Sequence, residues 1–381
     1  MIDIASFSDK LHDSGIEFIT GVPDTLLNDF CLHIEDSWSK DRHVIAANEG
    51  NAIGLAAGYH LATGTIPLVY MQNSGIGNTV NPLLSLTHGQ VYCMPMILLI
   101  GWRGERGSND HAQHNKQGEV TPLLLETMDV PYKVVPDNTE EALSILKWAL
   151  EVAITSNSPV ALLATKGVFE KGEKAGFNSE NEQLLSREEA INVVLDSIPE
   201  NSIVVASTGR ATRELYELRN IRNESHENDF LNVGAMGHTS SIALGIAMAT
   251  EREVVCLEGD SSAIMHLGSF STTGLMRPSN FLHIVLNNGV HESVGGQKSA
   301  GFNVDLTEIA KHCGYVTIEK SVKTIEEINT AIKTLNDSDG PAFMEIIIRK
   351  GIRKDMPPLR FDLLNSKKEL ICSLKGKNIN E

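Results

Sequence analysis

Short apolar runs rich in β-branched residues recur along the chain, and each ends in a turn of glycine or polar residues before a helix-like stretch. The runs lie at residues 18–24, 68–78, 96–105 and 160–167 in the first half, and at residues 203–210, 254–262, 281–289 and 342–351 in the second. Near-continuous apolar strands that alternate with helices are typical of parallel sheets covered by helices on both faces. The pattern therefore predicts an α/β fold with two doubly wound parallel-sheet domains.

A polar segment separates the two halves. Residues 167–187, GVFEKGEKAGFNSENEQLLSR, are rich in Gly, Lys, Glu and Asn, which is typical of a domain boundary. A chain of 381 residues also exceeds the usual size of a single hydrophobic core. We therefore expect a first domain at 1–168, a linker at 169–186, a second domain at 187–360 and a C-terminal tail at 361–381.

The amino-acid composition disfavours some classes of binding partner. The chain is 41% hydrophobic and 21% charged with a net charge of −17, which favours a globular protein that binds neither nucleic acid nor a membrane. Its five cysteines are far apart and form no C-x-x-C pair, as expected for reduced thiols rather than disulfides or a zinc site. The first residues lack a signal-peptide core, and no apolar run is long enough to span a bilayer. We therefore expect a cytoplasmic protein.

The turns after the strands are the places where chemistry is expected, because ligands of such sheets sit at the carboxyl ends of the strands. No turn has the P-loop pattern of nucleotide-hydrolysing enzymes. The glycines at 75–77 begin like a dinucleotide-binding fingerprint but do not continue as one. A nucleotide or nicotinamide function therefore lacks its motif.

Acid and amide side chains do follow two successive strands of the second half. Asp260 follows the run 254–257, and Asn287-Asn288 follow the next run, one helix and one strand later. Hard oxygen ligands at one sheet edge suit Mg²⁺ or Ca²⁺, and such a cation could join Asp260 to a phosphate beside the donors of Ser261 and Ser262. Taken singly, the same residues predict only a helix cap and a turn. Together they favour a metal site.

This spacing of Gly-Asp and Asn-Asn resembles the cofactor signature of thiamine-diphosphate enzymes, and the segment NVGAMGHTSSIALGIA at 232–247 resembles the region that precedes it. The resemblance implies that Met236 wedges the cofactor into its bent form and that the Gly234 carbonyl accepts from its aminopyrimidine. It implies that the Mg²⁺ ligands are Asp260, Asn288 and the backbone carbonyl of Val290. The diphosphate would lie at Gly259, Asp260, Ser261 and Ser262, with Ser261 where many members have glycine.

The first half carries the other part of the signature. In HVIAANEGNAIGLAAGYHLATG, at 43–64, an acid ends a short strand and precedes a helix of small residues. The resemblance implies that this acid, Glu49, bonds the pyrimidine ring of the cofactor and promotes its reactive tautomer. By itself, a glutamate in the first turn of a helix is explained by the helix dipole. The second-half signature favours the cofactor role.

Longer strings narrow the resemblance, which extends over nearly the whole chain. TGVPDTLL, NSGIGNTVNPLLSL, MILLIGWRGERG, QHNKQG and NNGVHESVGGQ resemble the phosphonopyruvate decarboxylase branch, with sulfopyruvate decarboxylases as close relatives. The chain departs from the branch at 109–112, where an acid and a proline are expected before Gln-His. The resemblance implies Mg²⁺-dependent, non-oxidative decarboxylation of 3-phosphonopyruvate to phosphonoacetaldehyde and CO2, in phosphonate biosynthesis of the 2-aminoethylphosphonate type.

Such a substrate carries a second anion, which needs cationic or N–H donors. Candidates for the substrate site are Asp24, Thr25, Ser74, Asn78, Arg103, Arg106, His114, Lys116, Gln117 and Lys298. His291 and Glu292 lie beside the predicted metal turn and are candidates for proton transfer. His111 and His114 have the spacing of a metal pair, but no further ligand is close in sequence, so solvent-facing histidines are favoured over zinc ligands.

Three functions are consistent with these residues. The first is phosphonopyruvate decarboxylation, and the second is decarboxylation of sulfopyruvate or another 2-oxo acid, or carboligation of aldehydes. The third is a noncatalytic thiamine-diphosphate-binding subunit, which the presence of both Glu49 and Asp260 disfavours. The resemblance also implies that domains of different subunits hold the two ends of one cofactor, so we expect a homodimer or a higher homo-oligomer.

Overall fold

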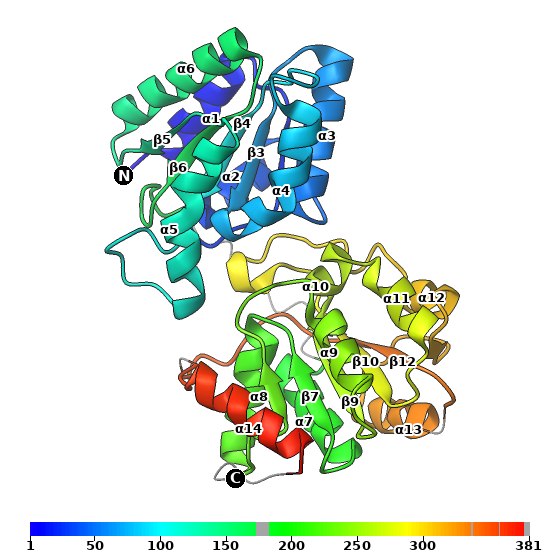
Figure 1. Ribbon diagram of the computed structural model, residues 1–381. Helices are drawn as coiled ribbons and strands as arrows, with labels where there is room; N and C mark the ends of the chain where they lie inside the picture. Colours follow the sequence, from blue (N-terminus) through cyan, green and yellow to red (C-terminus); the bar gives the residue numbers. More distant parts are fainter. Residues whose placement is uncertain (173–182, 337, 358, 377–381) are drawn as a thin grey trace. The chain divides into compact units, whose positions relative to one another are not determined.

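The structure is a computed structural model that describes residues 1–172, 183–336, 338–357 and 359–376 (Figure 1). The chain forms two compact units. Unit 1 comprises Met1–Ala175 and Ser293–Gln297, and unit 2 comprises Gly176–Glu292 and Lys298–Glu381. Residues 173–182 of the expected linker and 377–381 of the expected tail lie outside the described residues.

Unit 1 is built on a six-stranded parallel sheet in the order β2-β1-β3-β4-β6-β5. Its strands are β1 (Ile19–Gly21), β2 (His43–Ile45), β3 (Leu68–Gln72), β4 (Ile97–Gly101), β5 (Tyr132–Val135) and β6 (Val160–Ala164). Its helices are α1 (Ile4–Asp13), α2 (Asn28–Ser37), α3 (Glu49–Thr63), α4 (Ile76–Pro82), α5 (Ala112–Thr127) and α6 (Thr139–Ser156), with short turns η1 (Asn73–Gly75) and η2 (Leu83–Thr87).

The sheet of unit 1 is buried on both faces. Along β4, Ile97 and Leu99 belong to one core cluster, which includes residues of α1, α2 and α6. Leu98 and Ile100 point the other way, into a second cluster with residues of α3 and α5. Alternate side chains of a strand face opposite sides of a sheet, so a run that is apolar at every position requires helices on both faces.

Unit 2 repeats this architecture with the order β11-β12-β10-β9-β7-β8. Its strands are β7 (Ile203–Ala206), β8 (Asp229–Leu231), β9 (Val254–Gly259), β10 (Phe281–Asn287), β11 (Val316–Thr317) and β12 (Ala342–Ile347). Its helices are α7 (Arg187–Ser197), α8 (Arg210–Ile221), α9 (Thr239–Ala247), α10 (Asp260–Met265), α11 (Ser269–Met276), α12 (Leu306–His312), α13 (Ile325–Asn336) and α14 (Leu363–Leu374), with the turn η3 (Glu292–Val294).

The two sheets have the same topology. In chain order within each unit, the second strand lies at one edge beside the first, and the fifth lies at the other edge beside the sixth. All pairings between these strands are parallel. The predicted α/β class with two doubly wound parallel sheets is confirmed.

The tail after Arg360, for which the sequence leaves open a short amphipathic helix or a frayed end, contains α14. Asp362 caps this helix through the N–H groups of Leu364 and Asn365. Leu370 is buried, and the Arg252 guanidinium donates to Ser373 Oγ at 2.9 Å, so α14 packs on unit 2. Among the described helices, none is both long and apolar enough to cross a membrane.

Candidate functional site

Asp24 follows β1 at the carboxyl edge of the unit 1 sheet and is fully buried. Gln72 Nε2 donates to Asp24 Oδ1 at 2.5 Å, and the Leu26 N–H donates to Oδ2 at 3.0 Å. Burial raises the pKa of Asp24, and these hydrogen bonds only partly oppose that rise. Ser74 Oγ in turn donates to Gln72 Oε1 at 2.7 Å. The structure thus joins Asp24 and Ser74 through Gln72, whereas Thr25 is exposed.

Glu49 is the first residue of α3 and is 6% exposed. Asn48 caps the helix by accepting the Asn51 N–H at 2.9 Å, which fixes where the helix begins. Asn78 Nδ2 donates to Glu49 Oε2 at 2.7 Å. A side chain at Gly75 would collide with the Glu49 carboxyl. Glu49 and Asn78, predicted from separate motifs, therefore meet at one sheet edge.

The loop after β4 contains an ion pair that the sequence did not predict. Asp110 accepts from Arg103 Nε at 2.7 Å and also from Nη2, so the guanidinium is held along one side. Burial raises the pKa of Asp110, but the Arg103 hydrogen bonds, the His111 N–H and the charges of Arg103 and His114 together outweigh it, so the net pKa is lowered. Asn73 bonds the backbone N–H of Arg103 at 3.0 Å and its carbonyl at 2.9 Å. Much of the donor capacity of Arg103 is therefore used within the loop.

The other predicted residues of this loop differ in burial. His114 is half-buried, and burial followed by the charge of Arg103 lowers its pKa. Gln117 is also half-buried. Arg106 is exposed and lines an open pocket of about 500 Å³. Lys116 is exposed and forms an ion pair with Glu119 at 3.0 Å. Arg106 and Lys116 are therefore solvated in this structure.

In unit 2, Asp260 begins α10 directly after β9 and is 2% exposed. β9 pairs with β10 so that Gly259 lies opposite Leu286, which brings Asp260 and Asn287 to the same edge. Both side chains closely approach Gly301. Burial raises the pKa of Asp260 to about 6, although Ser299 Oγ donates to its Oδ2. A buried carboxylate of this kind gains from a bound cation.

Asn287 and Asn288 have different roles at this edge. Asn287 Nδ2 donates to the Gly301 carbonyl and to Glu345 Oε1, both at 2.8 Å, so Asn287 holds the loop at 301 in place. Asn288 Oδ1 accepts the Val290 N–H at 3.2 Å. Asn288 is 4% exposed and Val290 is 3% exposed.

These residues fit a divalent cation beside a diphosphate. Asp260, Asn288 and the Val290 carbonyl offer the hard oxygen ligands that Mg²⁺ prefers. Among the described residues, the buried Ser261 Oγ has no hydrogen-bond partner, and buried polar groups are normally satisfied. A diphosphate oxygen would satisfy that hydroxyl.

Glu292 is tightly held rather than free. Its carboxylate accepts from the Arg187 guanidinium, from the Gly351 N–H and from Asn288 Nδ2, the last at 3.2 Å. Arg187 also bonds Glu214 at 3.1 Å, and burial raises the pKa of Glu214 to about 7. These contacts allow Glu292 to position Asn288. They are equally consistent with the predicted role of Glu292 in proton transfer.

The remaining predicted residues of this loop lie on either side of Glu292. His291 is half-buried, and burial lowers its pKa to about 4, so it is neutral near pH 7. Lys298 is exposed, and its backbone forms an antiparallel bridge with Val290. The bridge closes the loop that contains His291.

The segment before α9 forms a tight turn that contains Met236. Ala235 has a φ of 48° and Gly237 a φ of 83°, so residues in the left-handed region flank Met236 on both sides. Such a conformation is unusual for a residue with a side chain and often marks a functional turn. The Gly237 N–H donates to Ser262 Oγ at 3.1 Å, which ties the turn to α10.

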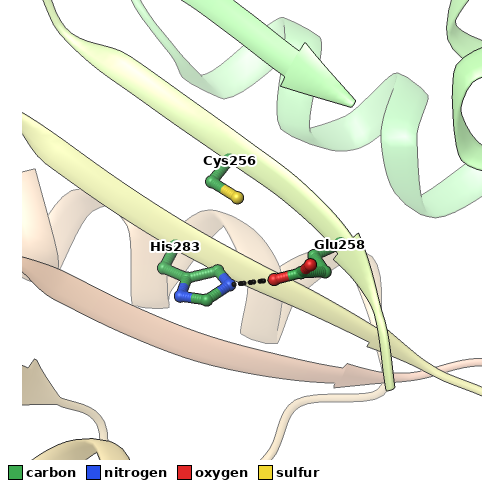
Figure 2. A group of neighbouring side chains, drawn as sticks. All are labelled: Cys256, Glu258 and His283. Carbon is green, nitrogen blue, oxygen red and sulfur yellow. Dashed lines mark hydrogen bonds and ion pairs between the residues drawn. The ribbon is translucent and has the colours of Figure 1, made fainter. Parts of the chain in front are cut away.

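Behind Ser262 lies a buried pair that the sequence analysis missed. Ser262 Oγ donates to Glu258 Oε1 at 2.7 Å, and Glu258 Oε2 lies 3.1 Å from His283 Nε2 (Figure 2). Glu258 and His283 are both fully buried, on neighbouring strands. A hydrogen-bonded chain therefore extends from the sheet interior to the Gly237 turn.

Cys256 lies near this pair, so the three side chains have the composition of a metal site. A cysteine binds a metal ion as a thiolate. Burial raises the pKa of Cys256 well above its ordinary value, which disfavours the thiolate. His283 is surrounded by the rings of Phe270, Phe281 and Phe343. The cluster is therefore best described as a structural Glu-His pair. A glutamate and a histidine inside otherwise apolar runs were the signal that could have revealed it.

Comparison with known proteins agrees with this arrangement. Residues 5–124 match the family model of the N-terminal TPP binding domain of thiamine pyrophosphate enzymes, and residues 207–346 match that of the C-terminal TPP binding domain. The phosphonopyruvate decarboxylase of Streptomyces viridochromogenes is 32% identical over 365 residues, which are 92% of this chain and 89% of that protein. The chain belongs to the thiamine pyrophosphate enzyme family.

Two further relatives of this thiamine pyrophosphate enzyme are also named as decarboxylases. The phosphonopyruvate decarboxylase of Streptomyces hygroscopicus is 31% identical over 92% of this chain and 88% of that protein. The sulfopyruvate decarboxylase of Methanosarcina acetivorans is 25% identical over 90% of each chain. The resemblance drawn from the sequence motifs is confirmed, and the relatives of this enzyme are carboxy-lyases.

Proposed function

We propose that this protein decarboxylates 3-phosphonopyruvate to phosphonoacetaldehyde and CO2, with thiamine diphosphate and Mg²⁺. The observation that carries the proposal is the near full-length match to phosphonopyruvate decarboxylases, at 32% and 31% identity. The buried acids of the two units support it, because Glu49 and Asp260 lie at the sheet edges where such enzymes hold a cofactor.

Each part of the cofactor has candidate residues in this chain. Asp260, Asn288 and the Val290 carbonyl would hold Mg²⁺, and Gly259, Ser261 and Ser262 would contact the diphosphate. Met236 would support the bent cofactor, and the Gly234 carbonyl would accept from its amino group. When bound, thiamine diphosphate accepts the electron pair that the departing CO2 leaves behind.

Glu49 would control a proton at the pyrimidine ring. The Glu49 side chain is largely excluded from solvent, and the hydrogen bond from the Asn78 amide fixes the orientation of Oε2. A positioned, desolvated carboxyl group can share a proton with a ring nitrogen. Asp24 and Ser74 shape the same edge of the unit 1 sheet. His291 or Glu292 would donate protons to the substrate or accept protons from it.

A second candidate substrate is sulfopyruvate. The observation that favours it is the match to the sulfopyruvate decarboxylase of Methanosarcina acetivorans, which covers 90% of this chain at the lower identity of 25%. Sulfonate and phosphonate are both compact oxyanions, so one cationic site could serve either of them. They differ in charge near neutral pH, which makes a direct comparison of the two substrates informative.

Assembly, location and pathway complete the proposal. We expect a homodimer or higher homo-oligomer, because in this family domains of different subunits hold one cofactor. A cytoplasmic location is consistent with the five cysteines, which are free thiols in the described residues. The aldehyde product would enter phosphonate biosynthesis.

The test is release of CO2 and aldehyde by the purified protein with thiamine diphosphate and Mg²⁺. Phosphonopyruvate, sulfopyruvate and pyruvate are compared at equal concentrations, and Glu49→Ala is the control. We expect a strong preference for phosphonopyruvate that the variant loses, while calorimetry still detects cofactor binding. Inert wild-type protein that binds the cofactor would refute decarboxylation, and a preference for sulfopyruvate would reassign the substrate.

A further inference from the structure

Helix α8 has two arginines in its first turns, at the end of a helix where positive charge is least favourable. The turn Ser207–Gly209 follows β7, and Arg210 is the first residue of α8, with Arg213 one turn later. Gly209 provides no side-chain cap, and the first turn contains no acid. The N-terminus of a helix already carries a partial positive charge from its free N–H groups. Two arginines there make a strongly electropositive position.

Both arginines lack partners among the residues that the structure describes. Neither forms a hydrogen bond or an ion pair there, and the Nε of each is buried and unsatisfied. By contrast, Arg187, Arg219 and Arg222 of the same unit each contact a carboxylate. Buried donors are normally satisfied, so Arg210 and Arg213 have the character of a binding site without its ligand.

The charges around Arg210 are also consistent with a binding site for an anion. Burial and then the charge of Arg213 lower the pKa of Arg210. An arginine side chain is a cation at neutral pH in any protein environment. The nearby carboxylates of Glu214 and Glu292 oppose this shift only in part. Both are already bonded to Arg187. A bound anion would therefore add a favourable partner for the two guanidinium groups.

The pair lies at the sheet edge that contains the proposed cation site. β7 is the neighbour of β9, with Ala206 opposite Leu257, and Asp260 follows β9. The charge of Glu292 acts on Arg210, and Glu292 accepts a hydrogen bond from Asn288. Arg210 after β7 therefore lies at the same sheet edge as the predicted ligands Asp260, after β9, and Asn288, after β10.

We propose that Arg210 and Arg213 bind the second anionic group of the substrate, the phosphonate of a 3-phosphono-2-oxo acid. This inference rests on the proposed decarboxylase function and assigns its substrate specificity. Arginine matches a phosphonate because its planar fork donates paired hydrogen bonds to two oxygens. The cationic candidates from the sequence fit less well, since Arg103 is bonded to Asp110 and Arg106 and Lys116 are exposed.

The experiment uses Arg210→Gln, Arg213→Gln and Arg210→Lys in the full-length holoenzyme. Arg222→Gln is the matched control, because Arg222 caps the opposite end of the same helix. The KM for phosphonopyruvate is measured at saturating cofactor, and the Kd for thiamine diphosphate with Mg²⁺ is measured by calorimetry. Thermal melting verifies that each variant is folded.

We expect each Gln variant to raise the KM for phosphonopyruvate about tenfold or more, because a charge-assisted hydrogen bond is lost. Arg210→Lys should raise it less, and Arg222→Gln should leave it unchanged. The Kd for thiamine diphosphate should stay within about twofold of wild type.

Two outcomes would overturn the inference while the decarboxylase function stands. One is an unchanged KM in both Gln variants. The other is a rise in KM matched by an equal loss of cofactor affinity, which would assign the pair to the cofactor diphosphate. Absence of phosphonopyruvate turnover in the wild type would instead refute the proposed function.

Discussion

Gly75 illustrates how one residue can determine the position of Glu49, the proposed catalytic acid. Its hydrogen faces the Glu49 carboxyl so closely that any side chain would collide with it. Gly77, two positions later, has open space where a side chain would be. The two glycines therefore form a natural comparison between a required and a permissive site.

We predict that Gly75→Ala displaces Glu49 and breaks its 2.7 Å hydrogen bond with Asn78. Turnover should fall by about two orders of magnitude, as expected when a catalytic group is misplaced by about 1 Å. Gly77→Ala is the control and should retain nearly full activity. Equal activity of the two variants, with equal melting temperatures, would contradict the prediction.

His43 carries a pH dependence of stability. It lies in β2, with Nε2 2.9 Å from the Tyr70 hydroxyl, and burial lowers its pKa from 6.5 to about 4. The unfolded chain therefore binds a proton between these values that the folded chain does not. This stability is present above pH 6.5 and is lost as the pH falls towards 4.

The expected loss is about 2 kcal/mol between pH 7 and 5. Urea unfolding of wild type and His43→Gln measures it, with tryptophan fluorescence as the signal. Trp38, Trp102 and Trp148 all lie in unit 1, which contains β2. The wild type should lose more stability than the variant over this pH interval. Parallel losses would assign the effect to other groups.

Some residues were predictable from sequence and others were not, for a physical reason. Asp260 and Asn288 follow neighbouring strands of one parallel sheet, whose shared edge brings them together, and Glu49 follows a strand end of the other sheet. The pairing of Arg103 with Asp110 depends on how one loop folds back on itself, which local pattern does not specify. That partner uses part of the hydrogen-bonding capacity of Arg103, whose role as a substrate contact stays a prediction.

At the scale of elements, β9 and α10 together hold the Gly237 turn. Glu258 ends the buried part of β9, and Ser262 on α10 connects its carboxylate to the Gly237 N–H. His283 on β10 secures the far side of Glu258. The turn that contains Met236 is thus fixed by hydrogen bonds from the sheet interior, rather than by the loop alone.

We predict that Ser262→Ala lowers the free energy of unfolding by about 1–2 kcal/mol, because it leaves the buried Gly237 N–H and the buried Glu258 Oε1 without a partner. Thiamine diphosphate should also bind more weakly to this variant. Ser271→Ala removes an exposed hydroxyl from α11 and is the control. Calorimetry supplies both quantities. Unchanged cofactor affinity in Ser262→Ala would show that the turn holds its shape without the chain of hydrogen bonds.

At the scale of the whole molecule, α3 has two contrasting faces. Ala52, Ile53, Ala56 and Ala57 are buried in unit 1. On the other side, Gly54, Leu55, Gly58 and Leu61 are exposed, with no atoms near the position of a side chain at either glycine. A smooth apolar helix face of this kind permits close packing of another helix, and a second copy of the chain would provide one.

We therefore predict sedimentation at twice the chain mass of 41.5 kDa or more, with a shift towards monomer in Leu61→Asp. Loss of activity should accompany the shift, because the proposed function has domains of different subunits hold one cofactor. Lys147→Asp, on the exposed surface of α6, is the control. A fully active monomer would refute both the assembly and the shared site.

The repeated strand order has a consequence for how the chain folds during synthesis. All six strands of the first sheet have been made once residue 164 leaves the ribosome, and each pairs within that sheet. The first sheet can therefore close before β7 exists, and strands of the two similar sheets are kept from mispairing. Only Ser293–Gln297 of unit 1 arrives late, and it docks on a body that is already folded.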